Sequence, residues 1–129
     1  MKILLDTHAL LWYVLDDVRL SIPARQVIDG LESRALVSPA SYWEIAIKIS
    51  LKKYVLAVPF GVFWKCAIED NGFEILPIDI RHTEMLIGMP YRDHRDPFDR
   101  LLVAQALAEK AIVVTADPRF EQYGVQRIW

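Results

Sequence analysis

Four carboxylates stand where one expected element gives way to the next, and together they have the chemistry of a metal site. Asp6 and Asp117 each follow an apolar run typical of a strand, Asp99 opens a helix, and Glu44 lies within another. Carboxylates that share a pocket repel one another, and a protein tolerates this by protonation or by binding a hard cation. Oxygen ligands suit Mg²⁺ or Mn²⁺. Such a cation can activate water and stabilise the oxygens of a phosphodiester.

The elements that must position these acids alternate between strands and helices. We expect strands over 2–5, 35–38, 74–78, 111–115 and 125–128, and helices over 9–15, 21–31, 39–50, 60–70, 80–89 and 97–108. This order predicts an α/β sandwich with a mostly parallel sheet. The carboxyl ends of parallel strands lie along one edge, where ligands bind. The four acids, far apart in the sequence, are therefore expected to meet there.

The helix that follows His94 carries two of the candidate acids. Asp96 is expected at the N-cap with Pro97 in the first helical position, and Asp99 falls in the first turn. Both carboxylates also have a purely structural explanation, because each would stabilise the positive end of the helix dipole by about 0.5–1 kcal/mol. This stretch alone does not separate a cap from a site.

Two serines compete to begin the helix that carries Glu44. If Ser41 were the N-cap, Glu44 would complete a capping box and be structural. We favour Ser38, because Pro39 then takes the first helical position. Glu44 is then left with Lys48 one turn on, a contact worth only about 0.2–0.5 kcal/mol, and is free to face a site.

Composition places the chain among compact globular proteins. Its 129 residues are 53% hydrophobic and 25% charged, and we expect a single domain over 1–129. No apolar run approaches the roughly 18 residues of a membrane span, and we expect a cytoplasmic protein without a membrane partner. The net charge of −2 gives no global attraction to nucleic acid. Because Cys66 is the single cysteine of the sequence, an intrachain disulfide and a cysteine-based zinc site are excluded. We expect Cys66 in or near the core.

Four motifs in this order resemble those of PIN-domain proteins, and more narrowly the VapC-like toxins of prokaryotic toxin–antitoxin pairs. They are Lys2-Ile-Leu-Leu-Asp6-Thr7, the helical Glu44, His94-Arg-Asp-Pro-Phe-Asp99-Arg-Leu-Leu-Val-Ala-Gln-Ala and Val114-Thr-Ala-Asp117. The resemblance implies a three-layer α/β/α sandwich with four or five strands. It also implies a Mg²⁺- or Mn²⁺-dependent endoribonuclease that is usually a homodimer and is inhibited by a cognate antitoxin covering the acidic site.

Carried over by position, the resemblance assigns roles to individual residues. The catalytic and metal-binding quartet is Asp6, Glu44, Asp99 and Asp117. Thr7 and Thr115 match the small hydroxyl residues that orient water. Arg95 and Arg100 flank the expected mouth, where they would hold phosphate or simply face solvent. Neither His8 nor His94 matches a ligand position, and Asp96 is best explained as a cap.

Two other functions compete with RNA cleavage. An aspartate after the first strand also suggests a haloacid-dehalogenase-like phosphatase, in which Asp6 would be the nucleophile. Such enzymes carry a second aspartate two residues on, where this chain has His8. The other alternative is a non-catalytic module of the same fold that binds RNA or protein, although all four acids are present.

An unusually aromatic segment is the candidate surface for an antitoxin. Its members are Tyr54, Phe60, Phe63 and Trp64, to which Trp12 and Trp43 are added. Any one of them is more simply explained as core. As a group they exceed what a small domain readily buries, and we expect a groove that receives an amphipathic helix of the antitoxin.

Overall fold

A five-stranded, fully parallel sheet forms the centre of the molecule in the computed structural model, which describes residues 1–91 and 93–129. Its spatial order is β3-β2-β1-β4-β5. The strands are β1 (Lys2–Leu5), β2 (Arg34–Val37), β3 (Glu74–Ile75), β4 (Ile112–Val114) and β5 (Arg127–Ile128). Leu5 is level with Val37 of β2 on one side and with Val114 of β4 on the other. The expected α/β architecture is confirmed.

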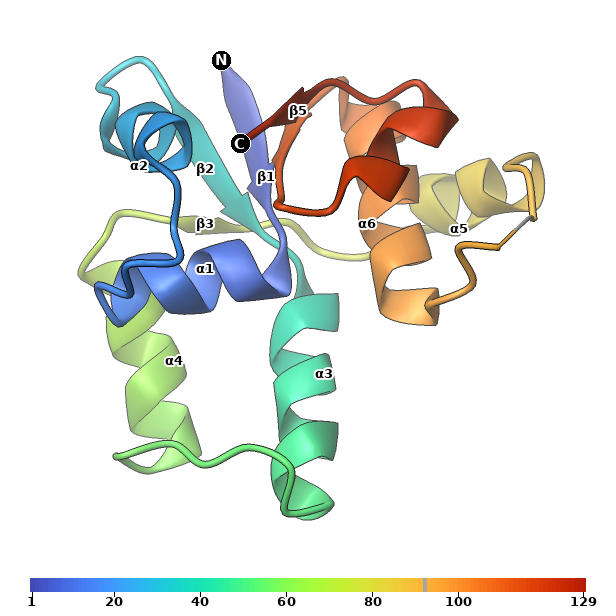
Figure 1. The fold of residues 1–129 in the computed structure, drawn as a ribbon. Helices are drawn as coiled ribbons and strands as arrows, with labels where there is room; N and C mark the ends of the chain where they lie inside the picture. Colours follow the sequence, from blue (N-terminus) through green and yellow to red (C-terminus); the bar gives the residue numbers. More distant parts are fainter. Residues whose placement is uncertain (92) are drawn as a thin grey trace.

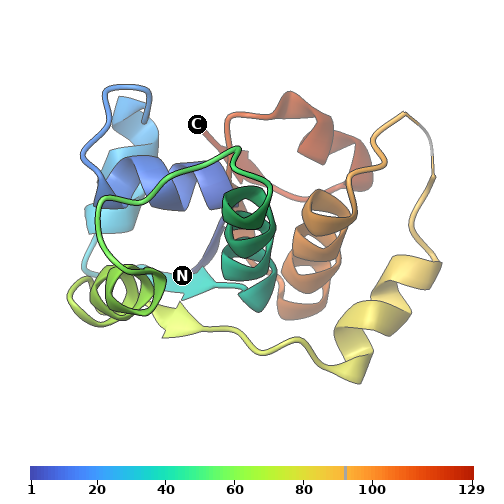
Figure 2. The ribbon, with the colours of Figure 1, turned by 90° about the horizontal axis from the view of Figure 1, so that it is seen from below.

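Helices cover both faces of this sheet, as Figures 1 and 2 show. They are α1 (Thr7–Val14), α2 (Ile22–Asp29), α3 (Pro39–Ser50), α4 (Phe60–Glu69), α5 (Ile80–Ile87) and α6 (Pro97–Glu109), with a 3₁₀ helix over Pro118–Tyr123. Side chains alternate along β1, so Ile3 and Leu5 pack in the core with α1, α2 and α4, whereas Leu4 packs with α6 on the opposite face. The result is the expected three-layer sandwich.

Local capping chemistry begins the two helices that matter most for the site. The Ser38 hydroxyl accepts the backbone N–H of Ala40, with Pro39 in the first helical position of α3. At the start of α6, the Asp96 carboxylate accepts the backbone N–H of Asp99 over 2.9 Å. Both expected caps are confirmed, and the alternative capping box at Ser41 is wrong.

Several boundaries differ from the sequence-based expectation. The helix expected over 9–15 begins earlier, at Thr7, because Asp6 caps it. The strand expected over 74–78 has only two residues, both exposed, because β3 pairs with β2 alone and Pro77 follows. The expectation for Cys66 is wrong: the thiol is exposed on α4, whose buried positions are Phe63, Trp64 and Ala67.

Within the described ranges, no helix has both the length and the apolar composition needed to cross a membrane.

Candidate active site

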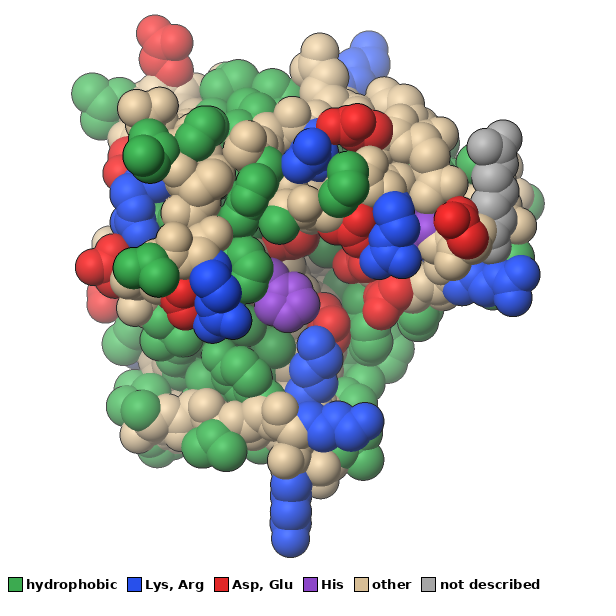
Figure 3. Space-filling model, in the orientation of Figure 1, with side chains coloured by type: hydrophobic (Ala, Val, Ile, Leu, Met, Phe, Trp, Pro, Cys, Tyr) green, Lys and Arg blue, Asp and Glu red, His purple; other side chains and the backbone are tan. Residues whose placement is uncertain are grey.

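A small pocket opens where the central strands end. Asp6 directly follows β1, and Thr115 follows β4 in the adjacent position, as expected for parallel neighbours. The pocket has a volume of about 220 Å³. Acidic side chains gather in a hollow near the middle of the face in Figure 3, beside a histidine and between basic side chains. The carboxyl edge of the sheet therefore carries a concentrated negative charge.

All four acids of the expected quartet line this pocket, together with the capping Asp96. Its other lining residues are Thr7, His8, Lys48, Arg119 and Phe120. The pocket thus contains three more carboxylates than cationic side chains. It draws on four separate parts of the chain: the β1–α1 junction, α3, the start of α6, and the segment after β4.

Asp6 is the most deeply buried of the acids. Its carboxylate accepts the backbone N–H of Ala9 over 2.6 Å and a hydrogen bond from the Thr115 side chain. Burial nevertheless raises the pKa of Asp6 to about 6, and the nearby charges of Glu44 and Asp117 raise it further against the two hydrogen bonds. A bound cation would offset this penalty.

Glu44 is tied to the pocket by a residue of another helix. The Thr7 hydroxyl donates to Oε1 of Glu44 over 2.8 Å and lies 3.1 Å from the hydroxyl of Ser41. On the other side, Nζ of Lys48 lies 3.1 Å from Oε2 of Glu44. Glu44 therefore makes the expected contact with Lys48 and also faces the site.

Asp99 has a partner that sequence reasoning did not find. Nε2 of His94 lies 3.0 Å from Oδ2 of Asp99. Burial raises the pKa of Asp99 above its usual range, the charges of Asp96 and Asp6 add to this, and the contact with His94 opposes it. The only signal in the sequence was the placement of a histidine five residues before Asp99.

Asp117 is held by a cation two residues further along. Its carboxylate accepts the backbone N–H of Arg119 over 2.9 Å and a forked interaction from the guanidinium, with Nη2–Oδ2 at 2.7 Å. The Arg119 hydrogen bond lowers the pKa of Asp117. Asp117 is therefore ionised while Asp6 and Asp99 resist ionisation.

The donor chemistry of this pocket fits a hard divalent cation. Ligand atoms of His94, Asp99 and Asp117 all lie within 4.8 Å of one another. Carboxylate oxygens outnumber other donors, and the five carboxylates of the pocket outnumber its two cationic side chains, so the protein alone does not compensate the negative charge. These properties match Mg²⁺ or Mn²⁺ better than zinc.

Arg100 does not reach this pocket. Its side chain is 5% exposed, and its guanidinium donates to the carbonyl of Pro90 over 2.6 Å and to the hydroxyl of Tyr123 over 3.3 Å. Arg95 lies over the ring of Tyr91. The expectation that Arg100 holds phosphate at the mouth does not fit this placement, whereas Lys48 and Arg119 line the pocket instead.

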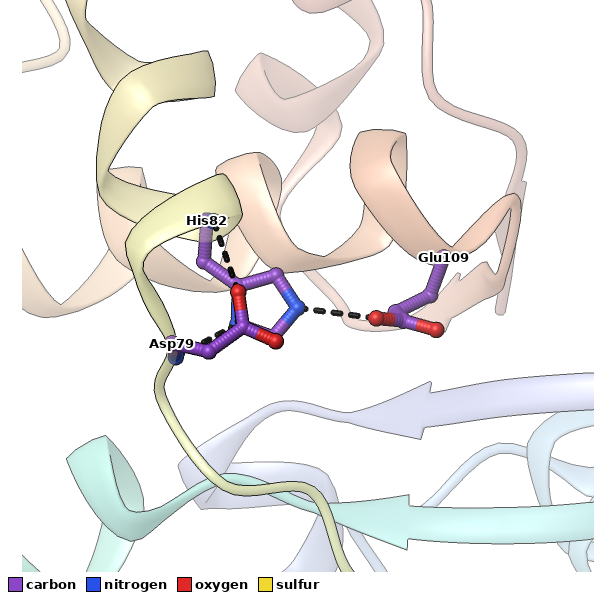
Figure 4. Close-up of side chains that lie close together, drawn as sticks. All are labelled: Asp79, His82 and Glu109. Atoms are coloured by element: carbon purple, nitrogen blue, oxygen red, sulfur yellow. Dashed lines mark hydrogen bonds and ion pairs between the residues drawn. The ribbon is translucent and has the colours of Figure 1, made fainter.

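A second group of acids and a histidine lies elsewhere, at the start of α5 (Figure 4). His82 accepts the backbone N–H of Asp79 at Nδ1 and contacts Glu109 through Nε2 at 2.9 Å. Glu109 also contacts Arg81 and Lys2. Because both ring nitrogens are engaged and cations already neutralise Glu109, this cluster fastens α5 to the end of α6 and does not fit a metal.

The aromatic segment divides between core and surface. Phe63 and Trp64 are buried, so they are core residues. Tyr54 and Phe60 line a surface pocket of about 440 Å³ with Ile49, Lys52, Val55, Leu56 and Val58, which we term the apolar groove. Trp43 is exposed and packs edge-on against Phe98, whereas Trp12 packs against Trp129. The six expected residues therefore do not form one surface.

Comparison with known proteins agrees with this architecture. The chain is 27% identical over 121 residues to Ribonuclease VapC22 of Mycobacterium tuberculosis, covering 94% of this chain and 91% of the relative. VapBC2 from Rickettsia felis, solved with a DNA fragment from their promoter, has a similar fold: the TM-score is 0.68 at 14% identity, over 98% of this chain and 97% of the other.

VapBC-1 from nontypeable Haemophilus influenzae is also similar, with a TM-score of 0.64 at 18% identity over 98% of this chain and 96% of the other. These structural similarities establish the fold. The decisive match is to a family: residues 3–126 match the PIN domain. With that match over nearly the whole sequence, the chain belongs to the PIN domain family.

Proposed function

We propose that this protein is a Mg²⁺- or Mn²⁺-dependent endoribonuclease and the toxin of a toxin–antitoxin pair. The observation that carries the proposal is the meeting of Asp6, Glu44, Asp99 and Asp117 in one pocket from four separate segments. Similarity to a protein named as a ribonuclease supports the substrate class. An RNA substrate in turn implies action in the cytoplasm.

In the proposed reaction the four carboxylates would hold the divalent cation. When bound, the cation supplies Lewis acidity that activates water for attack on a phosphodiester and stabilises the charge that develops on phosphate. The Thr7 hydroxyl orients Glu44, and the Thr115 side chain donates to Asp6. These hydrogen bonds fix the ligands before the cation arrives, which lowers the cost of assembling the site.

Two cationic side chains at the pocket are suited to hold RNA. Lys48 and Arg119 contact Glu44 and Asp117 in the protein alone. With those carboxylates engaged in a metal site, Lys48 and Arg119 would be free to contact phosphate. Arg119 has the planar fork that matches phosphate geometry.

The test is cleavage of end-labelled RNA by purified protein with Mg²⁺, with Mn²⁺ and with EDTA. Asp6→Asn and Asp99→Asn are expected to abolish cleavage, whereas the exposed Asp70→Asn retains it. Equal activity of all three variants, or full activity in EDTA, would overturn the assignment. Calorimetry with Mn²⁺ separates a catalyst from a non-catalytic module, because the latter has no need to bind the cation.

The phosphatase alternative has a different covalent chemistry. It requires an aspartyl-phosphate on Asp6, and a second carboxylate two residues later, where His8 stands. Trapping a phosphorylated Asp6 would favour that alternative over RNA hydrolysis.

For partners, we propose a cognate antitoxin and a second copy of this chain. The similar solved structures include VapBC assemblies. The apolar groove is the proposed seat for an amphipathic antitoxin helix, and Lys52 at its edge favours an acidic segment. Light scattering on the purified chain tests the homodimer directly.

A further inference from the structure

His94 lies beside the acidic pocket in the loop between α5 and α6. Its side chain is fully buried. The ring packs against Phe120 and Tyr123 at centroid distances of 5.5 and 5.7 Å, and its Nε2 lies 3.0 Å from Oδ2 of Asp99. Among the described residues, Asp99 is the hydrogen-bond partner of this buried imidazole.

The other ring nitrogen identifies the direction of that hydrogen bond. Nδ1 of His94 is buried and has no hydrogen-bond partner among the described residues. An ionised carboxylate can only accept a hydrogen bond, so the proton belongs on Nε2 and Nδ1 is the unprotonated nitrogen. The imidazole then donates its N–H to Asp99, as second-layer groups do when they orient metal-binding side chains.

The backbone around His94 is anchored by residues with no other role in the site. The Tyr123 hydroxyl donates to the carbonyl of His94 over 3.1 Å. Arg100 donates to the carbonyl of Pro90 and to the Tyr123 hydroxyl, and its guanidinium lies 4.6 Å from the ring centroid of Tyr91. The carbonyls of Pro90 and His94 are thus both held, which restrains the imidazole near Asp99.

We propose that His94 is a positioning residue that fixes the Asp99 carboxylate for a divalent cation shared with Asp117. Oδ2 of Asp99 accepts the N–H of His94, and the lone pairs that remain on the carboxylate would serve a cation. Tyr123 and Arg100 contribute indirectly, because their hydrogen bonds hold the backbone carbonyls of His94 and Pro90. This inference rests on the proposed metal-dependent function, and it gives Arg100 a role in place of phosphate binding.

The test compares His94→Leu, which removes the N–H, with His94→Gln, whose side-chain amide can restore a donor toward Asp99. Mn²⁺ affinity is measured by calorimetry on each purified chain without RNA, and folding is checked by thermal melting without metal. We expect Mn²⁺ to bind about 10- to 100-fold more weakly to the leucine variant, with much of the affinity restored in the glutamine variant.

A double-variant cycle separates positioning from general damage. In an Asp99→Asn background, His94→Leu is expected to cause no further loss of Mn²⁺ affinity, because the group that it positions is gone. A further loss of the full size, or a leucine variant that binds Mn²⁺ as tightly as the original chain, would overturn the inference.

Tyr123→Phe provides a milder change that keeps the ring. It is expected to weaken Mn²⁺ binding less than His94→Leu, while Tyr13→Phe, whose hydroxyl contacts Asp29, leaves binding unchanged. Equal Mn²⁺ affinity of the two tyrosine variants would contradict the role given to Tyr123. If the original chain binds Mn²⁺ and cleaves RNA but no His94 variant changes the affinity, only this inference fails; absence of Mn²⁺ binding by the original chain overturns the proposed function as well.

Discussion

The Thr7 hydroxyl donates to Oε1 of Glu44 over 2.8 Å and so joins the first turn of α1 to the middle of α3. Because α1 follows β1 and α3 follows the neighbouring β2, this single hydrogen bond links the helices that leave two adjacent strands. Removing this hydrogen bond leaves Glu44 with its ion pair to Lys48.

Thr7→Val is therefore expected to lower RNA cleavage by about 10- to 100-fold, since ligand-orienting groups have effects of this size. Thr83→Val is the matched control, because its hydroxyl donates only to the carbonyl of Ile80 on the exposed side of α5. Cleavage rates measured at saturating Mn²⁺ provide the check, and equal rates for both variants would contradict the role of Thr7.

The stability of the metal-free protein is expected to fall as pH rises from about 4 to about 6. Burial holds the pKa of Asp6 at about 6 in the folded protein, against 3.8 for an ordinary aspartate. The folded state then binds a proton that the unfolded chain releases in this range, so a rise in pH favours unfolding. Asp6→Asn removes this cost, which amounts to as much as about 3 kcal/mol at pH 7.

Melting curves in EDTA at several pH values provide the measurement. The asparagine variant is expected to melt above the original chain at pH 7, and the difference is expected to close near pH 4. Asp70→Asn, at an exposed position, serves as the control. A difference that does not change with pH would show that ionisation of Asp6 is not its cause.

Arg119→Met is expected to raise KM for RNA. It is also expected to reduce the slope of log binding constant against log salt concentration by about 1, the value for one lost phosphate contact. Arg34→Met is a matched control, because Arg34 makes the same forked contact with Glu74 but at the amino end of β2, away from the pocket. The check is a titration of RNA binding over a range of salt concentrations. Identical salt slopes for the two variants would exclude Arg119 from RNA contact.

His82→Leu is expected to destabilise the fold without changing Mn²⁺ affinity. The substitution leaves the backbone N–H of Asp79 and the carboxylate of Glu109 without one partner each, at a cost of about 1–3 kcal/mol. Urea unfolding and calorimetry measure the two properties separately. A parallel loss of Mn²⁺ affinity would show that this cluster, and not the pocket at Asp6, contributes to metal binding.

Val55→Asp in the apolar groove is expected to weaken binding of the antitoxin at least 10-fold while leaving RNA cleavage intact. Val55 is 85% exposed, so the aspartate is tolerated in the chain alone. Val18→Asp, at a position 98% exposed and outside the groove, is the control. Calorimetry with the cognate antitoxin measures the affinity, and equal binding by both variants would reject the groove.

Much of the fold could be predicted because its signals are local. Ser38-Pro39 and Asp96-Pro97 each combine a capping side chain with a proline that fits the first helical position, and both helices begin there. The two edge strands were harder to bound, because β3 and β5 each pair with a single neighbour and have only two residues. Cys66 shows the limit of residue type as a guide, since its place on α4 is set by which face the larger Phe63 and Trp64 occupy.

The acids could be placed near one another because parallel strands bring their carboxyl ends to one edge. The partners of these acids depend on the paths of the connecting segments, which the spacing of residues in the sequence does not encode. His94 contacts Asp99 from a loop, and the Arg119 side chain folds back on Asp117. Arg100 illustrates the opposite error. Successive helical residues point about 100° apart, so the neighbour of Asp99 on α6 faces away from the pocket and toward Tyr123.

The order of the strands also governs when the pocket can exist during synthesis. β1 is made before the other four strands but lies between β2 and β4, and the acid that follows β4 is Asp117. Since contacts between distant parts of a chain form only after both have left the ribosome, a nascent chain that stops short of Asp117 has no complete pocket. Translation through Asp117 thus precedes any activity that the acidic pocket has on RNA.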